Sequence, residues 1–124
     1  MTSRPAVIVI DAARPRLVAD FWRAVLGWEV VESDADGISI APGDGSWPGI
    51  DMFQVPEGKS IKNRLHLDLR ADGSSTEDEL QRLLNLGARR VDVGQGPEVS
   101  WVVLADPEGN EFCLLSRTVQ EMSR

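Results

Sequence analysis

The sequence has one cysteine, one histidine and no tyrosine, and it is poor in basic residues. The lone Cys113 cannot form an internal disulfide, and the lone His66 excludes every multi-histidine, Ser-His-Asp or Cys-His site that does not include it. The 13 Lys and Arg residues stand against 20 Asp and Glu residues, which gives a net charge of -7 at pH 7. A surface that binds nucleic acid or an anionic membrane needs clustered Lys and Arg, so we expect a small-molecule ligand instead.

Long apolar runs are also missing. No stretch has the length of a transmembrane helix or the character of a signal peptide, and the polar start at residues 1–4 leads straight into a predicted strand. Together with the single cysteine, these features predict a cytoplasmic protein. The 124 residues are 42% hydrophobic and 27% charged, which suits one soluble globular domain over residues 1–124.

The first half of the chain predicts a strand, a helix and three more strands. Residues 6–10 are mostly β-branched and are apolar on both faces, as in a strand that is covered on both sides. Apolar residues then recur at spacings of three and four, which predicts an amphipathic helix over residues 15–26 that Gly27 ends as a left-handed cap. Arg14, just before this helix, cannot accept the exposed N–H bonds as a capping side chain would. Short strands follow at residues 28–32, 37–40 and 50–55.

The second half starts again after a predicted connection at residues 59–63. A strand is expected at residues 64–70 and a helix at residues 76–86, where Thr76 and Glu79 have the spacing of a capping box. Another strand is expected at residues 89–93, and a polar tail at residues 116–124 suits one short helical turn.

The two halves therefore share one order of elements. Each predicted helix ends in Leu-Gly, and Leu26-Gly27 and Leu86-Gly87 lie about 60 residues apart, close to half the chain. The economical interpretation is an internal duplication of a βαβββ unit, with modules at about residues 5–58 and 63–116.

Residues 101–115, with the sequence WVVLADPEGNEFCLL, predict a β-hairpin that closes the second half. Pro107 presets the φ angle for the second position of a turn, and Gly109 suits a left-handed residue after it. In the returning strand, alternation puts Glu111 and Cys113 on one face, so an acid lies among apolar neighbours. Burying this carboxylate unpaired would cost several kcal/mol, so it needs a cation, a hydrogen-bonding ligand or water as its partner.

Two segments of the second half are typical of one known family. Residues 62–69, KNRLHLDL, open this half, and residues 106–112, DPEGNEF, close it, with Leu-Gly-Ala-Arg between them. In this combination the chain resembles the glyoxalase/bleomycin-resistance family, and more narrowly the small bacterial glyoxalase-like domains of the vicinal oxygen chelate superfamily. The resemblance covers nearly the whole chain. It implies an α+β fold in which two βαβββ modules form a curved mixed β-sheet cup with helices outside, and we also expect a homodimer.

In the metal-dependent members of this family, a divalent ion in the cup holds two vicinal oxygens of the substrate. The resemblance places His66 and Glu111 at two ligand positions, and it places Asp51 near a third, with Gln54 as the rival. The remaining position, in the first strand, falls near Val7, which cannot coordinate an ion. An imidazole and carboxylates suit zinc, nickel, iron(II) or manganese, but two firm ligands make a poor site. We therefore expect the isolated protein to bind a divalent metal weakly or not at all.

Alternation also predicts the other side chains that would line the cup. It puts His66, Asp68 and Arg70 on one strand face, opposite three leucines, and it puts Phe53 on the face of Asp51. Indoles at a cavity mouth stack on flat ligands, and two tryptophans are placed suitably for this role. The predicted pocket residues are Trp47, Phe53, Asp68, Arg70 and Trp101.

Several of these residues also have a plain structural interpretation. A lone histidine in a strand, such as His66, is more often a hydrogen-bonded structural residue than a ligand. Glu111 equally suits an edge charge that discourages sheet-to-sheet pairing, and Cys113 suits a small core residue. Trp47 and Trp101 would then close the ends of the sheet.

Three functions stay open at this stage. The first is a metal-assisted lyase, isomerase or dioxygenase, in which Glu111 is the catalytic carboxylate that moves a proton. The second is a metal-free binding module that sequesters a small aromatic or antibiotic-like compound, and the third is a non-catalytic partner domain. Val7 at a ligand position favours the second and third, whereas His66 and Glu111 together favour the first.

Overall fold

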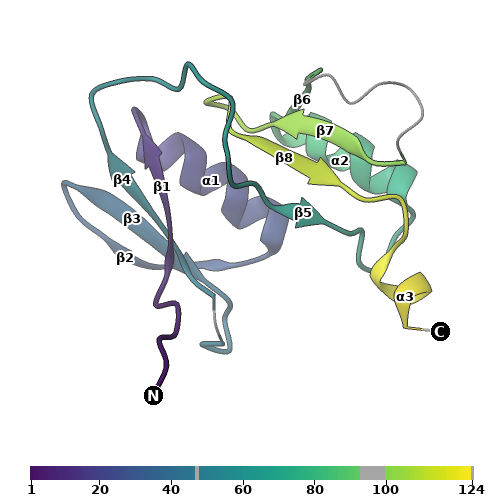
Figure 1. Ribbon diagram of the computed structural model, residues 1–124, viewed down its shortest axis with the longest axis horizontal. Coiled ribbons are helices and arrows are strands. Elements are labelled where there is room, and N and C mark those ends of the chain that lie inside the picture. Colours follow the sequence, from purple (N-terminus) through teal and green to yellow (C-terminus); the bar gives the residue numbers. More distant parts are fainter. Residues whose placement is uncertain (47, 93–99, 124) are drawn as a thin grey trace. The chain divides into compact units, whose positions relative to one another are not determined.

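The computed structural model describes residues 1–46, 48–92 and 100–123, which form two compact units with one four-stranded sheet each (Figure 1). The first unit is Met1–Gly58 and the second is Lys59–Arg124, so the boundary falls at the start of the predicted connection. Both units run strand, helix and then three strands. The α+β class and the two βαβββ modules are therefore confirmed.

The first unit builds its sheet in the order β1-β4-β3-β2, in which β1 and β4 are parallel and the other pairs are antiparallel. Helix α1 packs against β1, β3 and β4 on one face of this sheet (Figure 1). The Asp34 carboxylate accepts backbone bonds from Asp36 and Gly37, which stabilises the turn between β2 and β3. The bounds of the elements are β1 Ile8–Ala12, α1 Pro15–Leu26, β2 Glu29–Ser33, β3 Gly37–Ala41 and β4 Ile50–Gln54.

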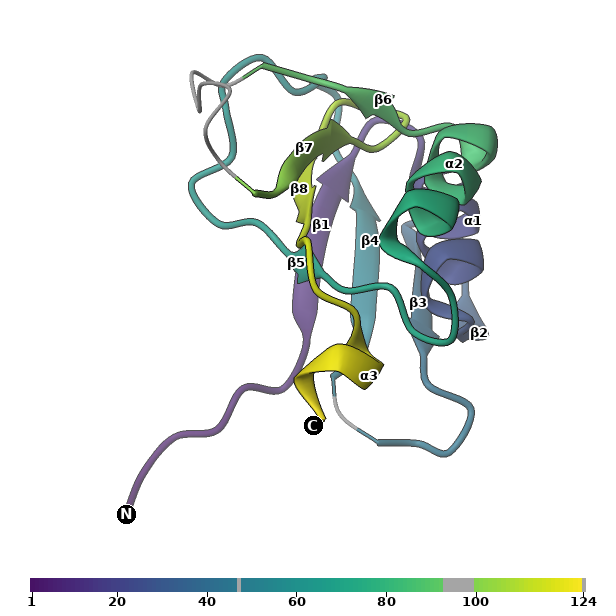
Figure 2. The ribbon, with the colours of Figure 1, turned by 90° about the vertical axis from the view of Figure 1, so that its right-hand side faces the viewer.

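The second unit has the same topology, because its sheet runs β5-β8-β7-β6 with β5 and β8 parallel. Helix α2 lies on one face of this sheet, as both ribbon views show (Figures 1 and 2). The tail contains α3, the predicted short helical turn. No helix within the described ranges has the length and apolar character that a membrane span requires. The bounds are β5 Asp68–Leu69, α2 Thr76–Leu86, β6 Arg89–Arg90, β7 Val102–Ala105, β8 Glu111–Leu114 and α3 Val119–Met122.

Helix α1 has the predicted bounds. No side chain caps its first turn at Arg14, and Gly27 ends it with a φ of 70°, a left-handed conformation that costs glycine little. Its apolar side faces the sheet: Trp22 is 2% exposed and lies in the core, where it meets Phe21 edge to face at 5.3 Å between ring centroids.

The predicted capping box at the start of α2 is wrong. Ser75 is the N-cap, and its hydroxyl oxygen accepts a bond from the backbone N–H of Asp78. Thr76 is already the first helical residue, and Glu79 pairs with Arg82 one turn further on. Three hydroxyl residues stand side by side at positions 74–76, and each has an acid three residues further on, so the spacing alone does not single out one of them; the backbone geometry selects Ser75.

The strands differ from the predictions mainly at their ends. Strand β1 begins two residues later than predicted, and it is covered on one side only, because Val9 and Asp11 are exposed whereas Ala12 is buried. An apolar run reads the same whichever face is covered, so the sequence did not reveal this. The strand predicted at residues 64–70 is reduced to β5 Asp68–Leu69. Just before that stretch, the backbone N–H of Asn63 bonds to the Glu111 side chain. Strand β6 is also shorter than predicted, and residue 93 lies outside the described residues.

Candidate functional site

The turn between β7 and β8 sets the position of the candidate residues that follow it. The Asp106 side chain is fully buried, and its carboxylate accepts backbone bonds from Glu108 and Asn110 and a side-chain bond from Asn110. Gly109 has a φ of 92° and donates its N–H to the Asp106 carbonyl oxygen at 2.8 Å. The predicted hairpin and its left-handed glycine are confirmed, and Glu111 follows this turn as the first residue of β8.

Glu111 has a cation within its own unit. Its Oε2 accepts a hydrogen bond from Nζ of Lys59 at 2.8 Å, and its Oε1 accepts one from the backbone N–H of Asn63 at 2.9 Å. The Lys59 and Glu111 side chains are 15% and 14% exposed, so solvent screens the pair only in part. Burial acts to raise the pKa of Glu111, but the bonds from Asn63 and Lys59 outweigh it and hold the pKa below the usual value.

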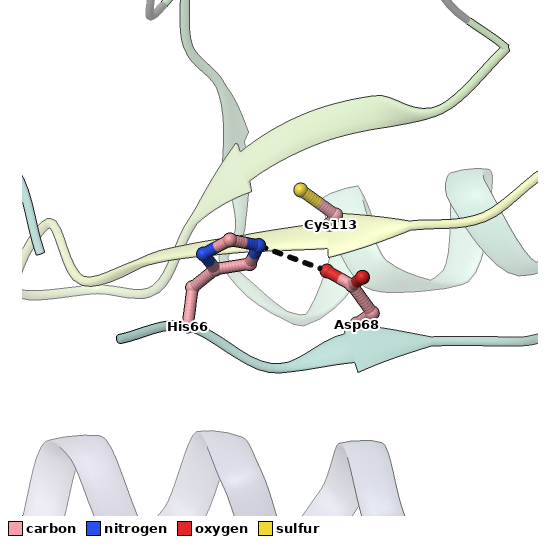
Figure 3. Close-up of side chains that lie close together, drawn as sticks. All are labelled: His66, Asp68 and Cys113. Atoms are coloured by element: carbon pink, nitrogen blue, oxygen red, sulfur yellow. Dashed lines mark ion pairs between the residues drawn. The ribbon is translucent and has the colours of Figure 1, made fainter. Parts of the chain in front are cut away.

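A second cluster joins His66, Asp68 and Cys113 (Figure 3). Nε2 of His66 lies 3.1 Å from Oδ1 of Asp68, and one donor atom from each of the three residues lies within 4.8 Å of the others. Asp68 opens β5 and stands directly opposite Cys113 of β8 in the parallel register. The His66 and Asp68 side chains are 40% and 47% exposed, whereas Cys113 is 7% exposed, so the cluster has an open side and a buried side.

The Cys113 thiol is held in its neutral form. Burial raises its pKa first, and the charge of Asp68 and a hydrogen bond to Asp68 raise it further, against a smaller opposite effect of Lys62. A nucleophilic cysteine needs a lowered pKa and a base as its hydrogen-bond partner. The cluster therefore does not have the arrangement of a Cys-His nucleophile.

The remaining predicted residues are spread over both units. Asp51 of β4 is half-buried and stands between Val9 and Ser39 in the sheet register, and Phe53, two residues on, is 43% exposed. Val7 lies one residue before β1. These three residues belong to the first unit.

The other predicted residues belong to the second unit. Arg70 donates from its guanidinium to the Arg117 carbonyl oxygen at 2.9 Å, which ties it to the tail. Trp101 is 39% exposed directly before β7. Trp47 lies outside the described residues. Within the second unit, the structure thus brings His66 and Asp68 together, and it joins Glu111 to a partner that was not predicted.

Sequence reasoning missed two members of these clusters, Lys59 and Cys113. Lys59 lies 52 residues from Glu111 in the chain, so no local spacing could reveal the pair. Cys113 had a usable signal, because alternation puts it on the same strand face as Glu111. It is buried, as the structural interpretation predicted, and it also contributes a sulfur to the cluster.

Comparison with known proteins gives the context of this geometry. The model of the family described as "Glyoxalase-like domain" matches residues 7–115. Among solved structures, the fosfomycin resistance protein FosX from Mesorhizobium loti is 15% identical, with 100% of both chains covered and a TM-score of 0.66. A mutant of FosX from Listeria monocytogenes, complexed with Mn(II) and 1S,2S-dihydroxypropylphosphonic acid, is 14% identical, with 98% of this chain and 95% of that chain covered and a TM-score of 0.69.

A glyoxalase/bleomycin resistance protein/dioxygenase family enzyme from Burkholderia phytofirmans is 18% identical, with 88% of this chain and 94% of that chain covered and a TM-score of 0.64. At these identities, the solved structures show a shared fold. No curated protein matches the chain by sequence. Because the family model spans nearly all of the two modules, the chain belongs to the glyoxalase-like domain family.

Proposed function

We propose that this protein binds a small organic molecule, and that Lys59 rather than a metal ion neutralises Glu111. The observation that carries the proposal is the Lys59–Glu111 pair, with its 2.8 Å bond. Both oxygens of the carboxylate already accept hydrogen bonds, one from an ammonium and one from a backbone N–H. The acid that the family resemblance assigns to a metal therefore has another partner.

The charges explain why a metal would not readily replace Lys59. An ion at Glu111 would have to displace the ammonium from the carboxylate and would then stand beside it as a second cation. Hydrogen bonds between charged groups contribute about 1.5–3 kcal/mol each. The Lys59 side chain is only 15% exposed, so leaving its charge unpaired would cost more free energy than leaving it unpaired in water. Val7, at the expected first-strand position, provides no ligand to offset this cost. The ligand set implied by the resemblance therefore does not fit a resident metal at Glu111.

The ligand class follows from the groups that remain exposed. His66 and Asp68 present a donor and acceptors at the open side of their cluster, and they suit a carbonyl or phenolic oxygen. Trp101 presents a half-exposed indole, a side chain that stacks on flat molecules. We therefore propose flat carbonyl or phenolic compounds as ligands, with the predicted pocket residue Arg70 of the same unit as a further candidate for contact.

The test compares metal content and ligand binding in the full chain. Purified protein is analysed for metals, treated with EDTA and screened by ligand-observed NMR against flat carbonyl and phenolic compounds. We expect compounds that bind after EDTA treatment and bind more weakly to His66→Ala, while Glu77→Gln, which removes an exposed acid of α2, matches the wild type. A stoichiometric metal that survives purification, and that is lost in both His66→Ala and Glu111→Ala, would overturn the proposal.

The second candidate function is a metal-assisted lyase, isomerase or dioxygenase. The FosX structure that contains Mn(II) supports it, because that protein shares the fold of this chain. In this case Glu111 would exchange Lys59 for the ion, so Lys59→Met should raise the affinity for manganese or nickel. Unchanged metal affinity in Lys59→Met would argue against this candidate.

Three further properties are proposed with this function. We expect one domain made of both modules, a homodimer and a cytoplasmic location. Light scattering on a size-exclusion column checks the dimer, which should have twice the 13.6 kDa mass of the chain. A single cooperative unfolding transition would support one domain.

A further inference from the structure

We propose that His66, Asp68 and Cys113 form a site for a thiophilic divalent ion such as zinc, distinct from Glu111. The proposal shares His66 and Asp68 with the ligand contacts of the proposed function, but it uses neither Glu111 nor Lys59, so its test can fail while the proposed function stands. It gives the second unit a metal site with a sulfur donor, set by the pairing of β5 and β8.

The parallel pairing of these strands fixes two of the three donors. Asp68 and Cys113 are partners in the register, and the backbone N–H of Cys113 donates to the Leu67 carbonyl oxygen at 2.9 Å. His66 lies two residues before Asp68, which is the spacing that brings side chains to the same face of an extended segment. Figure 3 shows the imidazole and the carboxylate turned toward each other, with the sulfur above β8 near them. The backbone therefore already collects the donors on one face.

The distances are close to those of a coordinated ion. With ligand bonds of about 2.0–2.3 Å to tetrahedral zinc, the ligand atoms themselves stand about 3.3–3.6 Å apart. The His66 and Asp68 atoms are 3.1 Å apart, and the three donor atoms lie within 4.8 Å of one another. Small side-chain rotations would close this difference without moving either strand.

The donor types select the class of ion. An imidazole nitrogen, a carboxylate oxygen and a thiolate sulfur suit zinc or cobalt, whereas manganese and magnesium prefer oxygen ligands. When the ion binds, a metal–sulfur bond forms and the Cys113 proton leaves for solvent. The Asp68 carboxylate and the thiolate then balance the two positive charges. The exposed side of the cluster leaves a fourth position for water or a ligand oxygen.

The rival interpretation is a hydrogen-bonded structural cluster that binds no ion. In that case His66 donates to Asp68, Cys113 donates to Asp68, and added metal ions find no better partner. The two interpretations differ in one observable, namely whether the sulfur becomes a thiolate ligand. A thiolate bound to cobalt(II) absorbs in the near ultraviolet by charge transfer, whereas a thiol does not.

The experiment titrates cobalt(II) into the EDTA-treated, reduced full chain. We expect a charge-transfer band that saturates at one equivalent and disappears on addition of zinc but not of equimolar manganese. Cys113→Ser should lose the band. Replacing even a residue outside the ligand set typically weakens metal binding 10- to 100-fold, so Asp68→Asn should weaken cobalt binding at least about tenfold. Glu77→Gln is the matched control, since it removes an exposed carboxylate of α2 and should bind cobalt as the wild type does.

Two results would overturn the proposal: no band at one equivalent of cobalt, or a band that persists in Cys113→Ser. If Cys113→Ser fails to fold, His66→Gln replaces it, because this side chain is 40% exposed and its loss should remove cobalt binding while leaving the thermal unfolding unchanged. Retained cobalt binding in His66→Gln would also reject the site. Cobalt binding that is lost in Cys113→Ser and kept in Glu111→Gln would support this site, and it would agree with a Glu111 side chain that holds no metal.

Discussion

The Lys59–Glu111 pair allows a quantitative test of the arrangement on which the proposed function rests. Exposed ion pairs contribute about 0–1 kcal/mol, and breaking a fully buried pair costs about 3–5 kcal/mol. With side chains 15% and 14% exposed, this pair lies between these limits. We expect Lys59→Met to lower the free energy of unfolding by about 2 kcal/mol, because it leaves the carboxylate with one bond, from Asn63.

A double-mutant cycle separates the pair from the cost of each single change. Glu111→Gln leaves Lys59 without its charged partner and should also cost about 2 kcal/mol, whereas the double variant should lose less than the sum, with a coupling energy of about 1.5 kcal/mol. The assay is urea unfolding of the full chain, followed both by tryptophan fluorescence and by circular dichroism, whose transitions must coincide.

The chain offers a matched control pair. Arg82 and Glu79 lie one turn apart on α2 with their atoms 2.7 Å from each other, but the Arg82 side chain is 45% exposed. The same cycle there should give a coupling energy of about 0.5 kcal/mol or less. A coupling between Lys59 and Glu111 no larger than that of this control would refute the claim that Lys59 neutralises Glu111 in place of a metal.

Three further predictions concern pH, the N-cap and a tight backbone contact. The pKa of Glu111 is lowered on folding, so its stabilising effect is fully present above its unfolded pKa of about 4.3 and is lost as the pH falls through its folded pKa. The coupling energy between Lys59 and Glu111 should therefore disappear when the cycle is repeated at the lowest pH at which the chain stays folded. A coupling energy that persists at this pH would contradict the prediction. Ser75→Ala should cost about 1 kcal/mol in urea unfolding because it removes the N-cap of α2, and a loss near zero would contradict that assignment. Gly37→Ala should cost about 1–3 kcal/mol, because its Cβ would collide with the Met52 carbonyl oxygen, while Gly58→Ala, with nothing near its Cβ, is the control that should stay close to wild type.

The helices could be predicted from the sequence because their signals are local. Apolar spacing, a proline at the start of α1 and a glycine after both α1 and α2 lie within a few residues of the structure they determine. The hairpin could be predicted equally well, since the turn Asp106–Asn110 is held by hydrogen bonds among its own residues. The ends of the strands could not be predicted in this way, because they depend on pairing with distant residues, as in β5, which pairs with β8 only at Asp68 and Leu69.

The candidate site could be predicted only in part from the sequence, for the same reason. Alternation identified His66, Asp68 and Glu111 as polar residues on strand faces, which is a local property. Their partners are distant in the chain: Cys113 meets Asp68 through strand pairing, and Lys59 reaches Glu111 from the start of the second unit. A sequence pattern can place a residue on a face, but the register between strands decides what stands opposite it.

The bond between Asn63 and Glu111 also has a consequence for synthesis of the chain. The Asn63 amide depends on a carboxylate that lies 48 residues further on, whereas β7 and β8 pair across one short turn. Contacts between distant residues form late, because the loop between them must close first. On the ribosome, residues 59–63 emerge long before Glu111 does. This segment should therefore stay unanchored until β8 has left the exit tunnel, and only then does the start of the second unit acquire its fixed path.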